Sequence, residues 1–388
     1  MVKRKLQGVS AMAALLIGSV TACSGLPTAT PVPDPAAAGG SDGEQRGFTL
    51  VASGDVLPHA SVIRQAQADA GGNGYDFAPM LVGVKSVVSE ADLAICHMET
   101  VYGADGGPYT GYPNFKSPPE VAKGLSSTGY DSCSTASNHS LDAGVDGIDR
   151  TLGALDKAGV KHVGSARTEA EAREPAWLKG GTAKVAQLAY TYGTNGYPLP
   201  EGRPWAVNLI DQEKIVADAR AARKAGADVV VVSLHWGTEW QDAPDDQQLR
   251  LGKALTASKT DDRPDIDLIL GTHAHVPQAY EKVNGTWVIY GMGDQIAGPM
   301  VNHSGAHDPR GNQGTIGRFT FAPPERAGER WVVRKAEFIP QWFDTDAGRV
   351  VNLNAAIAGG ADHSAVRDRI RKVVLSRGAG KGGLVMGQ

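Results

Sequence analysis

The chain has 388 residues, of which 41% are hydrophobic and 6% aromatic, and its formal net charge is -4. This length is sufficient for one large domain or two modest ones. The mild acidity argues against a nucleic-acid-binding protein, because such proteins carry a basic excess that complements the phosphate backbone.

The first 23 residues have the pattern of an export signal. Lys3, Arg4 and Lys5 precede the apolar stretch VSAMAALLIGSV, which is too short to span a membrane as a helix. Cys23 follows small residues, and this arrangement resembles a bacterial lipoprotein signal in which the cysteine is lipidated. The alternative is an ordinary cleaved secretory signal with an incidental cysteine. Both interpretations predict an extracytoplasmic protein, and the first predicts a lipid anchor to the bacterial cell membrane.

Residues 24–46 are rich in Pro, Ala, Gly and Ser, which predicts a disordered tether. From residue 48 onward, β-type runs alternate with stretches that have helical spacing of apolar residues. Near-continuous apolar runs joined by helices are typical of a largely parallel sheet covered on both faces. The clearest runs are FTLVASG (48–54), DLAICHME (92–99), DVVVVSLH (228–235) and DIDLILGTH (265–273).

Two later runs, TIGRFTFAP and RWVVRKAEFIP, alternate between apolar and polar residues and predict antiparallel strands. We therefore expect one α/β domain over residues 47–345. A C-terminal helix and a disordered tail are expected within 346–388, with disorder after residue 376. Cys96 and Cys133 both lie in strand-like runs, and the sequence leaves open whether they form a disulfide or remain buried thiols.

Polar residues with ligand-type side chains follow several of the β-type runs. In an open α/β sheet, ligands bind at the carboxyl ends of the strands, so these residues are expected to converge. Carboxylates, an amide oxygen and imidazoles suit two divalent cations such as Mn²⁺, Fe²⁺ or Zn²⁺ with one carboxylate shared. Burying them together without a metal would carry a heavy desolvation cost. The residues are Asp55, Glu99, Asn138, His139, His235, His273 and His275.

Each of these residues also has an ordinary structural explanation. Asp55 is in a position to cap a turn, His235 is compatible with a satisfied core histidine, and the HAH stretch (273–275) is compatible with a surface loop. Their occurrence together, in this order and each after a strand-like run, favours the metal site.

The order GD, E, NH, H and HxH resembles the calcineurin-type metallophosphoesterases. More narrowly, the chain resembles the CapA family of poly-γ-glutamate capsule biosynthesis proteins. The resemblance covers about residues 48–298 and implies a four-layer α/β/β/α sandwich, with two central mixed sheets flanked by helices. The matching stretches are SGDV, ADLAICHMET, FKSPPEVAKGL, GYDSCSTASNHSLDAG, SLHWGTEW and GTHAHVPQAYEKVNGTWVIYGMGD.

The resemblance also implies a role for each ligand. One cation would be held by Asp55 and His275, and Glu99 would be shared between the two cations. The second cation would be held by the three remaining ligands, Asn138, His235 and His273.

The same resemblance implies that His139 is the acid that protonates the leaving group. Asp142 stands three residues later, and it is expected to brace His139 or to cap a helix. Asp294 stands where the family usually has Asn, and it is expected to orient a ligand histidine.

Two histidines depart from the pattern. The wider superfamily has a histidine two residues after the first aspartate, in the pattern Asp-x-His. Here the next histidine, His59, stands four residues after Asp55, and it is either an alternative ligand or a loop residue. His97 replaces the usual Asn before Glu99. Because side chains alternate along a strand, His97 shares a face with Glu99 and is expected near the site.

The leading functional hypothesis is a surface-anchored, dinuclear-metal hydrolase of phosphoesterase type that acts in capsule or envelope polymer biosynthesis. One alternative is a non-catalytic export or anchoring factor that binds an anionic polymer, and another is a metal-dependent γ-glutamyl amide hydrolase. Expected partners are an anionic polymer or a phosphoester substrate, and the membrane through the lipid anchor. Lys116, Arg203 and Arg310 in Gly/Pro-rich loops are either contacts for an anionic substrate or solvated loop charges.

Overall fold

The computed structural model describes residues 46–326 and 329–388. The predicted export signal, Cys23 and all but the last residue of the predicted tether lie outside the described residues. None of the helices in the described part of the chain combines the length and apolar character needed to cross a membrane. The segment Gln45–Gln388 forms one unit with its own core.

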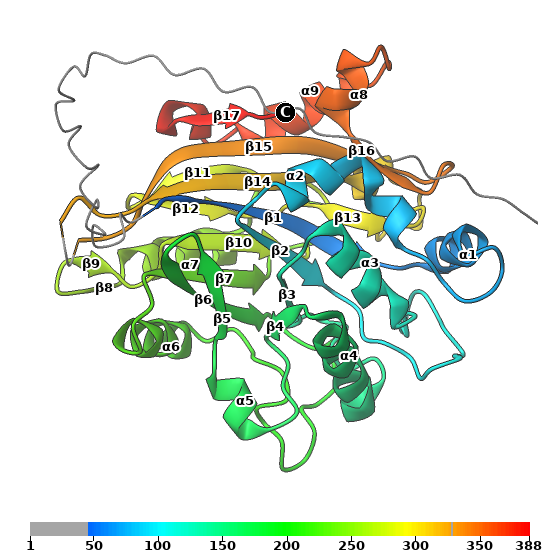
Figure 1. Cartoon of the computed structure of the whole chain (residues 1–388), viewed down its shortest axis with the longest axis horizontal. Coiled ribbons are helices and arrows are strands. Elements are labelled where there is room, and N and C mark those ends of the chain that lie inside the picture. Colours follow the sequence, from blue (N-terminus) through cyan, green and yellow to red (C-terminus); the bar gives the residue numbers. More distant parts are fainter. Residues whose placement is uncertain (1–45, 327–328) are drawn as a thin grey trace, which may run out of the picture. The chain divides into compact units, whose positions relative to one another are not determined.

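Two mixed β-sheets form the centre of this unit (Figure 1). The first has the order β16-β15-β14-β1-β2-β3-β4, with β13 also paired to β1 and β17 to β15. β1 to β4 run parallel, whereas β14 to β16 are antiparallel, as the alternating sequences of β14 and β15 predict. The strands are β1 (Phe48–Leu57), β2 (Leu93–Met98), β3 (Ser132–Ser134), β4 (Lys161–Val163), β13 (Asp294–Ala297), β14 (Gln313–Ala322), β15 (Val332–Asp344), β16 (Arg349–Asn352) and β17 (Leu384–Met386).

The second sheet has the order β11-β12-β10-β7-β6-β5. Its four central strands are parallel and its two edge strands are antiparallel to their neighbours. The strands are β5 (Ala176–Gly180), β6 (Ala183–Thr191), β7 (Val229–His235), β10 (Leu268–Thr272), β11 (Tyr280–Val283) and β12 (Thr286–Ile289). A separate two-stranded ribbon consists of β8 (Lys259–Thr260) and β9 (Arg263–Pro264).

Helices cover the outer face of each sheet. One apolar cluster joins the first sheet to α1 (Ala60–Asp69), η1 (Ala78–Val84), α2 (Lys85–Ser89), α3 (Glu120–Thr128) and α4 (Gly144–Ala158). Another joins the second sheet to α6 (Gln212–Lys224) and α7 (Asp246–Ala257). The predicted four-layer α/β/β/α sandwich is therefore confirmed. The remaining helices are α5 (Glu169–Arg173), η2 (Pro309–Asn312), α8 (Leu353–Ala358), α9 (Ser364–Val374) and η3 (Ala379–Gly382).

The polarity of β7 shows how the sequence positions a site between the sheets. All seven residues are buried, because the strand is covered on both faces. Val229 and Val231 belong to the core between the sheets, whereas Val230 and Val232 pack under the helices. Alternation then brings Ser233 and His235 to the inner face at the carboxyl end of the strand. The inner core therefore changes from apolar to polar where the strands end.

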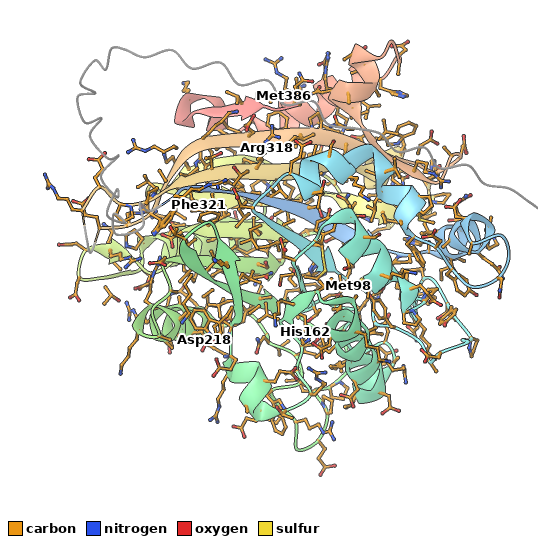
Figure 2. The ribbon with its side chains drawn as sticks, in the orientation of Figure 1. Met98, His162, Asp218, Arg318, Phe321 and Met386 are labelled. Atoms are coloured by element: carbon orange, nitrogen blue, oxygen red, sulfur yellow. A yellow bond between two sulfur atoms is a disulfide. The ribbon has the colours of Figure 1, made fainter. Side chains whose placement is uncertain are left out.

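The C-terminal predictions were wrong in two respects. A domain end at residue 345 is incorrect, because β16 and β17 both belong to the first sheet. The tail after residue 376 is also ordered. Leu384 of β17 is 3% exposed and lies opposite Ala336 on β15, and Met386 packs against the same core (Figure 2). The glycine-rich sequence has too few apolar residues to predict this strand. The strand is instead stabilised by its pairing with β15.

Cys96 and Cys133 form a disulfide, which resolves the alternative that the sequence left open. The two residues are direct partners in the parallel pairing of β2 with β3. Their side chains lie on the outer face, in the cluster beneath the helices. The crosslink therefore ties together the strands that precede Glu99 and Asn138.

Candidate metal centre

The six predicted metal ligands meet at one edge between the two sheets. The carboxyl ends of β1, β2, β7 and β10 converge there, and the pairing places Asp55 opposite His97 and Thr272 opposite His235. Side chains from the two sheets approach each other, with Nε2 of His235 3.8 Å from Oε1 of Glu99. All six are buried: Asp55, Glu99, Asn138, His235, His273 and His275.

Asp55 is fixed by the strand on either side of it. A Cβ atom on the preceding Gly54 would lie 1.7 Å from the carbonyl oxygen of Gly293, so only glycine allows the chain before β13 to approach β1. That approach places Asp294 opposite Asp55. Oδ2 of Asp55 accepts a hydrogen bond from the backbone N–H of His273 at 3.0 Å. The GD pair is therefore a packing requirement as well as a source of a carboxylate.

His235 is held by residues on both of its ring nitrogens. Nδ1 lies 3.0 Å from Oγ1 of Thr272, which orients the ring. Nε2 lies 2.8 Å from Oδ1 of Asn138. Nε2 of His235 therefore lies close to both Oδ1 of Asn138 and Oε1 of Glu99, which is the arrangement expected of atoms that bind the same cation.

The loop after β10 places two histidines in the left-handed region of the Ramachandran plot. His273 has φ +91 and His275 has φ +56. Such angles are rare for residues with a Cβ atom and carry a conformational cost that concentrates at functional sites. The loop is stabilised by Asp55 at His273 and by Asp294, whose Oδ1 lies 3.0 Å from Nδ1 of His275. The ring of His275 is thereby oriented as expected for a ligand with a carboxylate partner.

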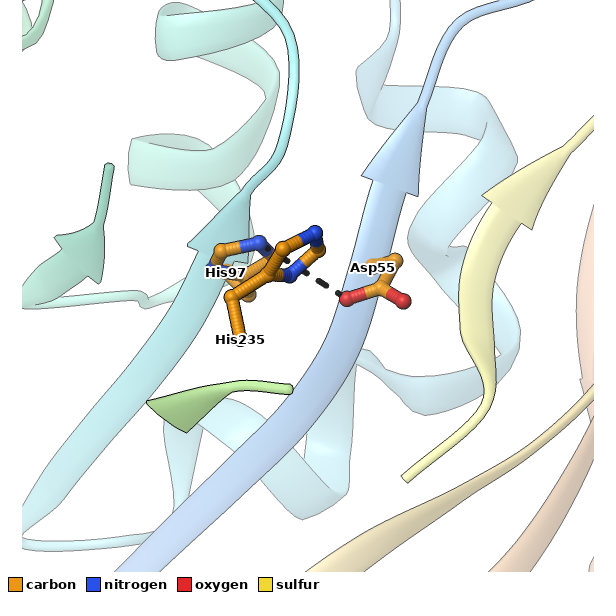
Figure 3. A group of neighbouring side chains, drawn as sticks. All are labelled: Asp55, His97 and His235. Atoms are coloured by element: carbon orange, nitrogen blue, oxygen red, sulfur yellow. Dashed lines mark ion pairs between the residues drawn. The ribbon is translucent and has the colours of Figure 1, made fainter. Parts of the chain in front are cut away.

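His97 lies inside the cluster and not merely near it. Its Nδ1 is 2.7 Å from Oγ of Ser134, and its Nε2 is 3.8 Å from Oδ1 of Asp55. Figure 3 shows the ring of His97 stacked on His235, with 4.6 Å between ring centroids, and directed at Asp55. Ligand atoms of these three residues lie within 4.8 Å of one another, and the same holds for Asp55, His275 and Asp294.

Several buried polar atoms in this cluster have no hydrogen-bond partner among the described residues. Leaving such atoms unpaired is costly in a protein interior, and native structures normally avoid it. Here the unpaired atoms are carboxylate oxygens and imidazole nitrogens, which are the donors that divalent cations prefer. The residues therefore fit bound metal ions. The atoms are Oδ1 of Asp55, Nε2 of His97, both carboxylate oxygens of Glu99, Nδ1 of His273 and Oδ2 of Asp294.

The electrostatics of the cluster agree with this fit. Burial raises the pKa of Asp55 to about 8, with a contribution from neighbouring Asp294, and raises the pKa of Glu99 well above its usual range. Burial also lowers the pKa of His97 to about 3 and that of His235 well below its usual range. A cation would offset the desolvation of the charged carboxylates, and the imidazoles that burial keeps neutral are already in the form that ligates a metal.

His139 stands beside this cluster, on the loop after β3. Its Nδ1 lies 2.7 Å from Oδ2 of Asp142, which also accepts the backbone N–H of Phe115 at 2.7 Å. The ring of Phe115 contacts the imidazole edge to face, at 4.8 Å between centroids. With Nδ1 paired to Asp142, Nε2 remains for chemistry. His139 lines a cavity of about 460 Å³ that opens beside the metal ligands.

His59 lines the same cavity but lies outside the two ligand groups. Its Nδ1 is 3.0 Å from the carbonyl oxygen of Leu57 and 3.1 Å from the backbone N–H of Gly298. Burial lowers its pKa to about 4. His59 therefore joins the start of α1 to the loop after β13.

The sequence did not assign roles to some residues that contact the proposed ligands or line the cavity. Thr272 and Glu239 lie inside the quoted motifs GTHAH and SLHWGTEW, so their positions carried a signal. Ser134 lies inside the quoted stretch GYDSCSTASNHSLDAG and carried the same signal, whereas Asn195 had none, because its contact depends on loop folding. Nδ2 of Asn138 donates to Oδ1 of Asn195 at 3.1 Å, which turns the amide oxygen of Asn138 toward His235.

Comparison with known proteins identifies similar sequences. Residues 49–299 match the family described as "Bacterial capsule synthesis protein PGA_cap". The chain is 30% identical over 179 residues to the PGA biosynthesis protein CapA of Bacillus subtilis (strain 168), covering 46% of this chain and 45% of that protein. It is 26% identical over 180 residues to the capsule biosynthesis protein CapA of Bacillus anthracis, covering 46% and 42%. The chain thus spans less than half the length of these relatives.

Solved structures with a similar arrangement include the calcineurin-like phosphoesterase YfkN from Bacillus subtilis. The match has 15% identity and a TM-score of 0.45, and it covers 85% of this chain and 100% of that one. A 5'-nucleotidase precursor from Thermus thermophilus matches with 16% identity and a TM-score of 0.44, covering 84% of this chain and 59% of that one.

Proposed function

The chain belongs to the bacterial capsule synthesis protein family, and we propose that its buried cluster binds two divalent cations and hydrolyses phosphoester bonds. The observation that carries this proposal is the set of unpaired ligand atoms on Asp55, Glu99, His97 and His273. A role in capsule or envelope polymer biosynthesis is supported by the family and by the names of the relatives. Attachment to the outer face of the membrane through lipidated Cys23 is part of the proposal and depends on the N-terminal sequence pattern.

The proposed ligands divide between the two cations. Asp55 and His275 would hold the first, and His97 is a further candidate because its free Nε2 faces Asp55. Glu99 would be shared, since both of its oxygens are unpaired. The second cation would be held by the remaining ligands, Asn138, His235 and His273.

The bound cations would supply an activated water and would neutralise charge on the attacking and departing oxygens of an in-line displacement. The chain's own contribution to the chemistry is the pair of His139 and Asp142. Asp142 holds Nδ1, which orients Nε2 as the atom that donates a proton to the leaving oxygen. Thr272 and Asp294 keep the rings of His235 and His275 in their binding orientations.

A binding-only protein would have no need of this acid. His139 is buried, paired with Asp142 and directed at a cavity beside the ligands, which is the arrangement of a proton donor. We therefore favour a hydrolase over a non-catalytic polymer-binding factor. A γ-glutamyl amide hydrolase would use the same ligands, so the choice of bond requires an experiment.

The test compares metal content and turnover in the unit 45–388 and its His139→Gln variant. We expect near two Mn²⁺ per chain in both proteins by mass spectrometry after reconstitution. Hydrolysis of an aryl phosphodiester should fall by about 10²- to 10⁴-fold in the variant, the range for loss of a general acid. His162→Gln is the matched control. His162 lies on β4, away from the cluster, and its Nε2 is 3.1 Å from Oδ1 of Asp156.

Three outcomes would contradict the proposal. Absence of bound metal in the wild-type protein would remove its basis. Turnover of γ-glutamyl p-nitroanilide in place of the phosphodiester would identify an amide hydrolase. Equal turnover by the wild-type and His139→Gln proteins would show that His139 is not the acid.

A further inference from the structure

The cavity beside the metal ligands has a wall made by loops. Tyr112 and Phe115 come from the loop after β2, Glu239 and Trp240 from the loop after β7, and Met300 from the loop after β13. This wall lies next to His139 and His275, so a substrate whose reacting group sits at the metal ligands extends its remaining part along it. The chemistry of the wall therefore selects that remaining part.

The wall does not have the charge that an anionic polymer requires. Among the described residues that line the cavity, none is Lys or Arg. Arg310, on the neighbouring loop, donates to both Asp308 and Asp242. Lys116 lines a different pocket, with Asp146 and Arg150. Of the three charges that the sequence offered as contacts for an anion, Arg310 is thus paired and Lys116 lines another pocket.

One carboxylate faces the cavity with only two histidines as ion-pair partners among the described residues. Glu239 is 26% exposed and accepts no hydrogen bond from any described residue. Its oxygens lie 4.0 Å from Nε2 of His273 and 3.5 Å from Nε2 of exposed His303, both beyond a good hydrogen bond. Glu239 is therefore available to a cationic group of a ligand.

Two aromatic residues, Trp240 and Tyr112, line the same cavity as this carboxylate. Trp240 has φ +67, a strained conformation that is held by a hydrogen bond from its backbone N–H to the carbonyl oxygen of Ala274 at 2.9 Å. A Cβ atom on Gly311 would come within 2.8 Å of the Trp240 ring, so the neighbouring loop leaves room for the indole. Tyr112 is 76% exposed although it is a large apolar side chain. Both rings are thus presented to the cavity at a conformational or solvation cost.

We propose that this wall binds an alkylammonium group carried by the phosphoester substrate, with Glu239 as its counter-ion and Trp240 and Tyr112 as its aromatic contacts. A carboxylate together with aromatic faces is the combination that recognises ammonium groups in water. An anionic remainder is repelled by Glu239, which gives specificity by charge. The inference depends on the proposed phosphoesterase function, because the metal ligands fix the other end of the substrate.

The test uses three p-nitrophenyl phosphodiesters that differ only in the second alcohol: choline, 3,3-dimethylbutanol and 3-hydroxypropanoate. The first two have the same shape and differ in one positive charge. We expect kcat/KM for the choline ester to exceed that of the dimethylbutyl ester by about 10-fold, a size consistent with a partly desolvated cation–π and carboxylate site. The carboxylate ester should be the poorest of the three.

The Glu239→Gln and Trp240→Leu variants should reduce the choline preference to about 2-fold or less while retaining their metal. The ratio between esters is an internal standard, so a general loss of activity does not affect it. Glu325→Gln is the control, because Glu325 is exposed on the hairpin at the opposite edge of the sheets and should leave the ratio unchanged. Loss of metal from Glu239→Gln would make Glu239 a ligand and overturn the inference.

Binding is measured separately, so that failure of hydrolysis is distinguished from failure of recognition. Calorimetry of the metal-loaded protein should give tighter binding of phosphocholine than of 3,3-dimethylbutyl phosphate. Equal affinities overturn the ammonium site even if both esters are hydrolysed. If no ester is hydrolysed but phosphocholine binds more tightly, the phosphoesterase proposal fails and the ammonium site stands. Headgroup release from phosphatidylcholine vesicles would identify a lipid as the source of the group, and turnover of the soluble ester alone would identify a soluble one.

Discussion

The candidate metal centre and the cavity wall lie side by side but are built differently. The proposed ligands Asp55 and His235 are part of buried strands, and Glu99 follows β2 directly. The wall residues Tyr112 and Trp240 lie on loops. Strands fix the positions of atoms that must share a cation, whereas loops tolerate changes that alter which substrate is bound. The other proposed ligands, Asn138, His273 and His275, lie on loops as the wall residues do, so strands hold only part of the candidate centre.

The loops of the wall are not left without support. Both oxygens of Asp242, two residues after Trp240, accept hydrogen bonds from Arg369 of α9, at 2.7 and 2.8 Å. Arg310 donates to the same carboxylate at 3.0 Å. The other end of the Arg369 guanidinium donates to Oε1 of Gln313 at 2.7 Å. The C-terminal helix, which lies beyond the matched family region, therefore fixes the wall.

The largest effect is expected from Asp55→Asn, which changes a proposed ligand that lies on a strand. The variant should retain less than one metal per chain and lose more than about 100-fold in turnover, because even supporting residues of metal sites contribute 10- to 100-fold. Added Mn²⁺ should raise the Tm of the wild-type protein, since it binds the folded state, but not that of the variant. Asp228→Asn is the control, because that carboxylate accepts the backbone N–H of Lys184 at the opposite edge of the second sheet. Full metal content in Asp55→Asn would show that Asp55 is not a ligand.

An intermediate effect is expected from removing the disulfide, which supports the strands and not the wall. The Cys96→Ser, Cys133→Ser double variant opens a crosslink between residues 37 apart. The free energy of unfolding, measured by urea denaturation, should fall by about 2–4 kcal/mol. The preference for the choline ester should be unchanged, because it depends on the loops. A changed preference with unchanged stability would contradict the separation of the two regions.

The smallest effect is expected from Arg369→Gln, which loosens only the wall. The KM for the choline ester should rise by about 2- to 5-fold, the range for a partly exposed ion pair, while metal content stays at the wild-type value. Arg367→Gln on the same helix is the matched control, because Arg367 pairs with its neighbour Asp368. A loss of metal in Arg369→Gln would show that the wall and the centre are mechanically one unit.

Several features were predictable because they depend on local pattern. The valine run of β7 predicted a buried strand, which the structure confirms, and the polar residue at its end made His235 a candidate site residue. The alternation of β2 is enough to place His97 on the same face as Glu99. The four-layer arrangement and the assignment of individual ligands came from the resemblance of whole motifs, not from periodicity.

Other features had no local signal. The order of β17 depends on pairing with β15, so its glycine-rich sequence predicts a disordered tail where the fold has a strand. The disulfide depends on the register of β2 against β3, which places Cys96 opposite Cys133. The support of Trp240 by Arg369 joins residues more than 120 positions apart through Asp242.

The sequence by itself determined which residue types stand at the ends of which strands, because burial and side-chain alternation act over a few residues. Only the tertiary structure decided that Nε2 of His97 faces Asp55, that Arg310 is already paired, and that the nearest cationic partners of Glu239 are histidines. These relations depend on how two sheets and their loops pack together. Contacts between residues far apart in the sequence are set by the packing of the whole domain. A pattern within a few neighbouring residues therefore does not predict them.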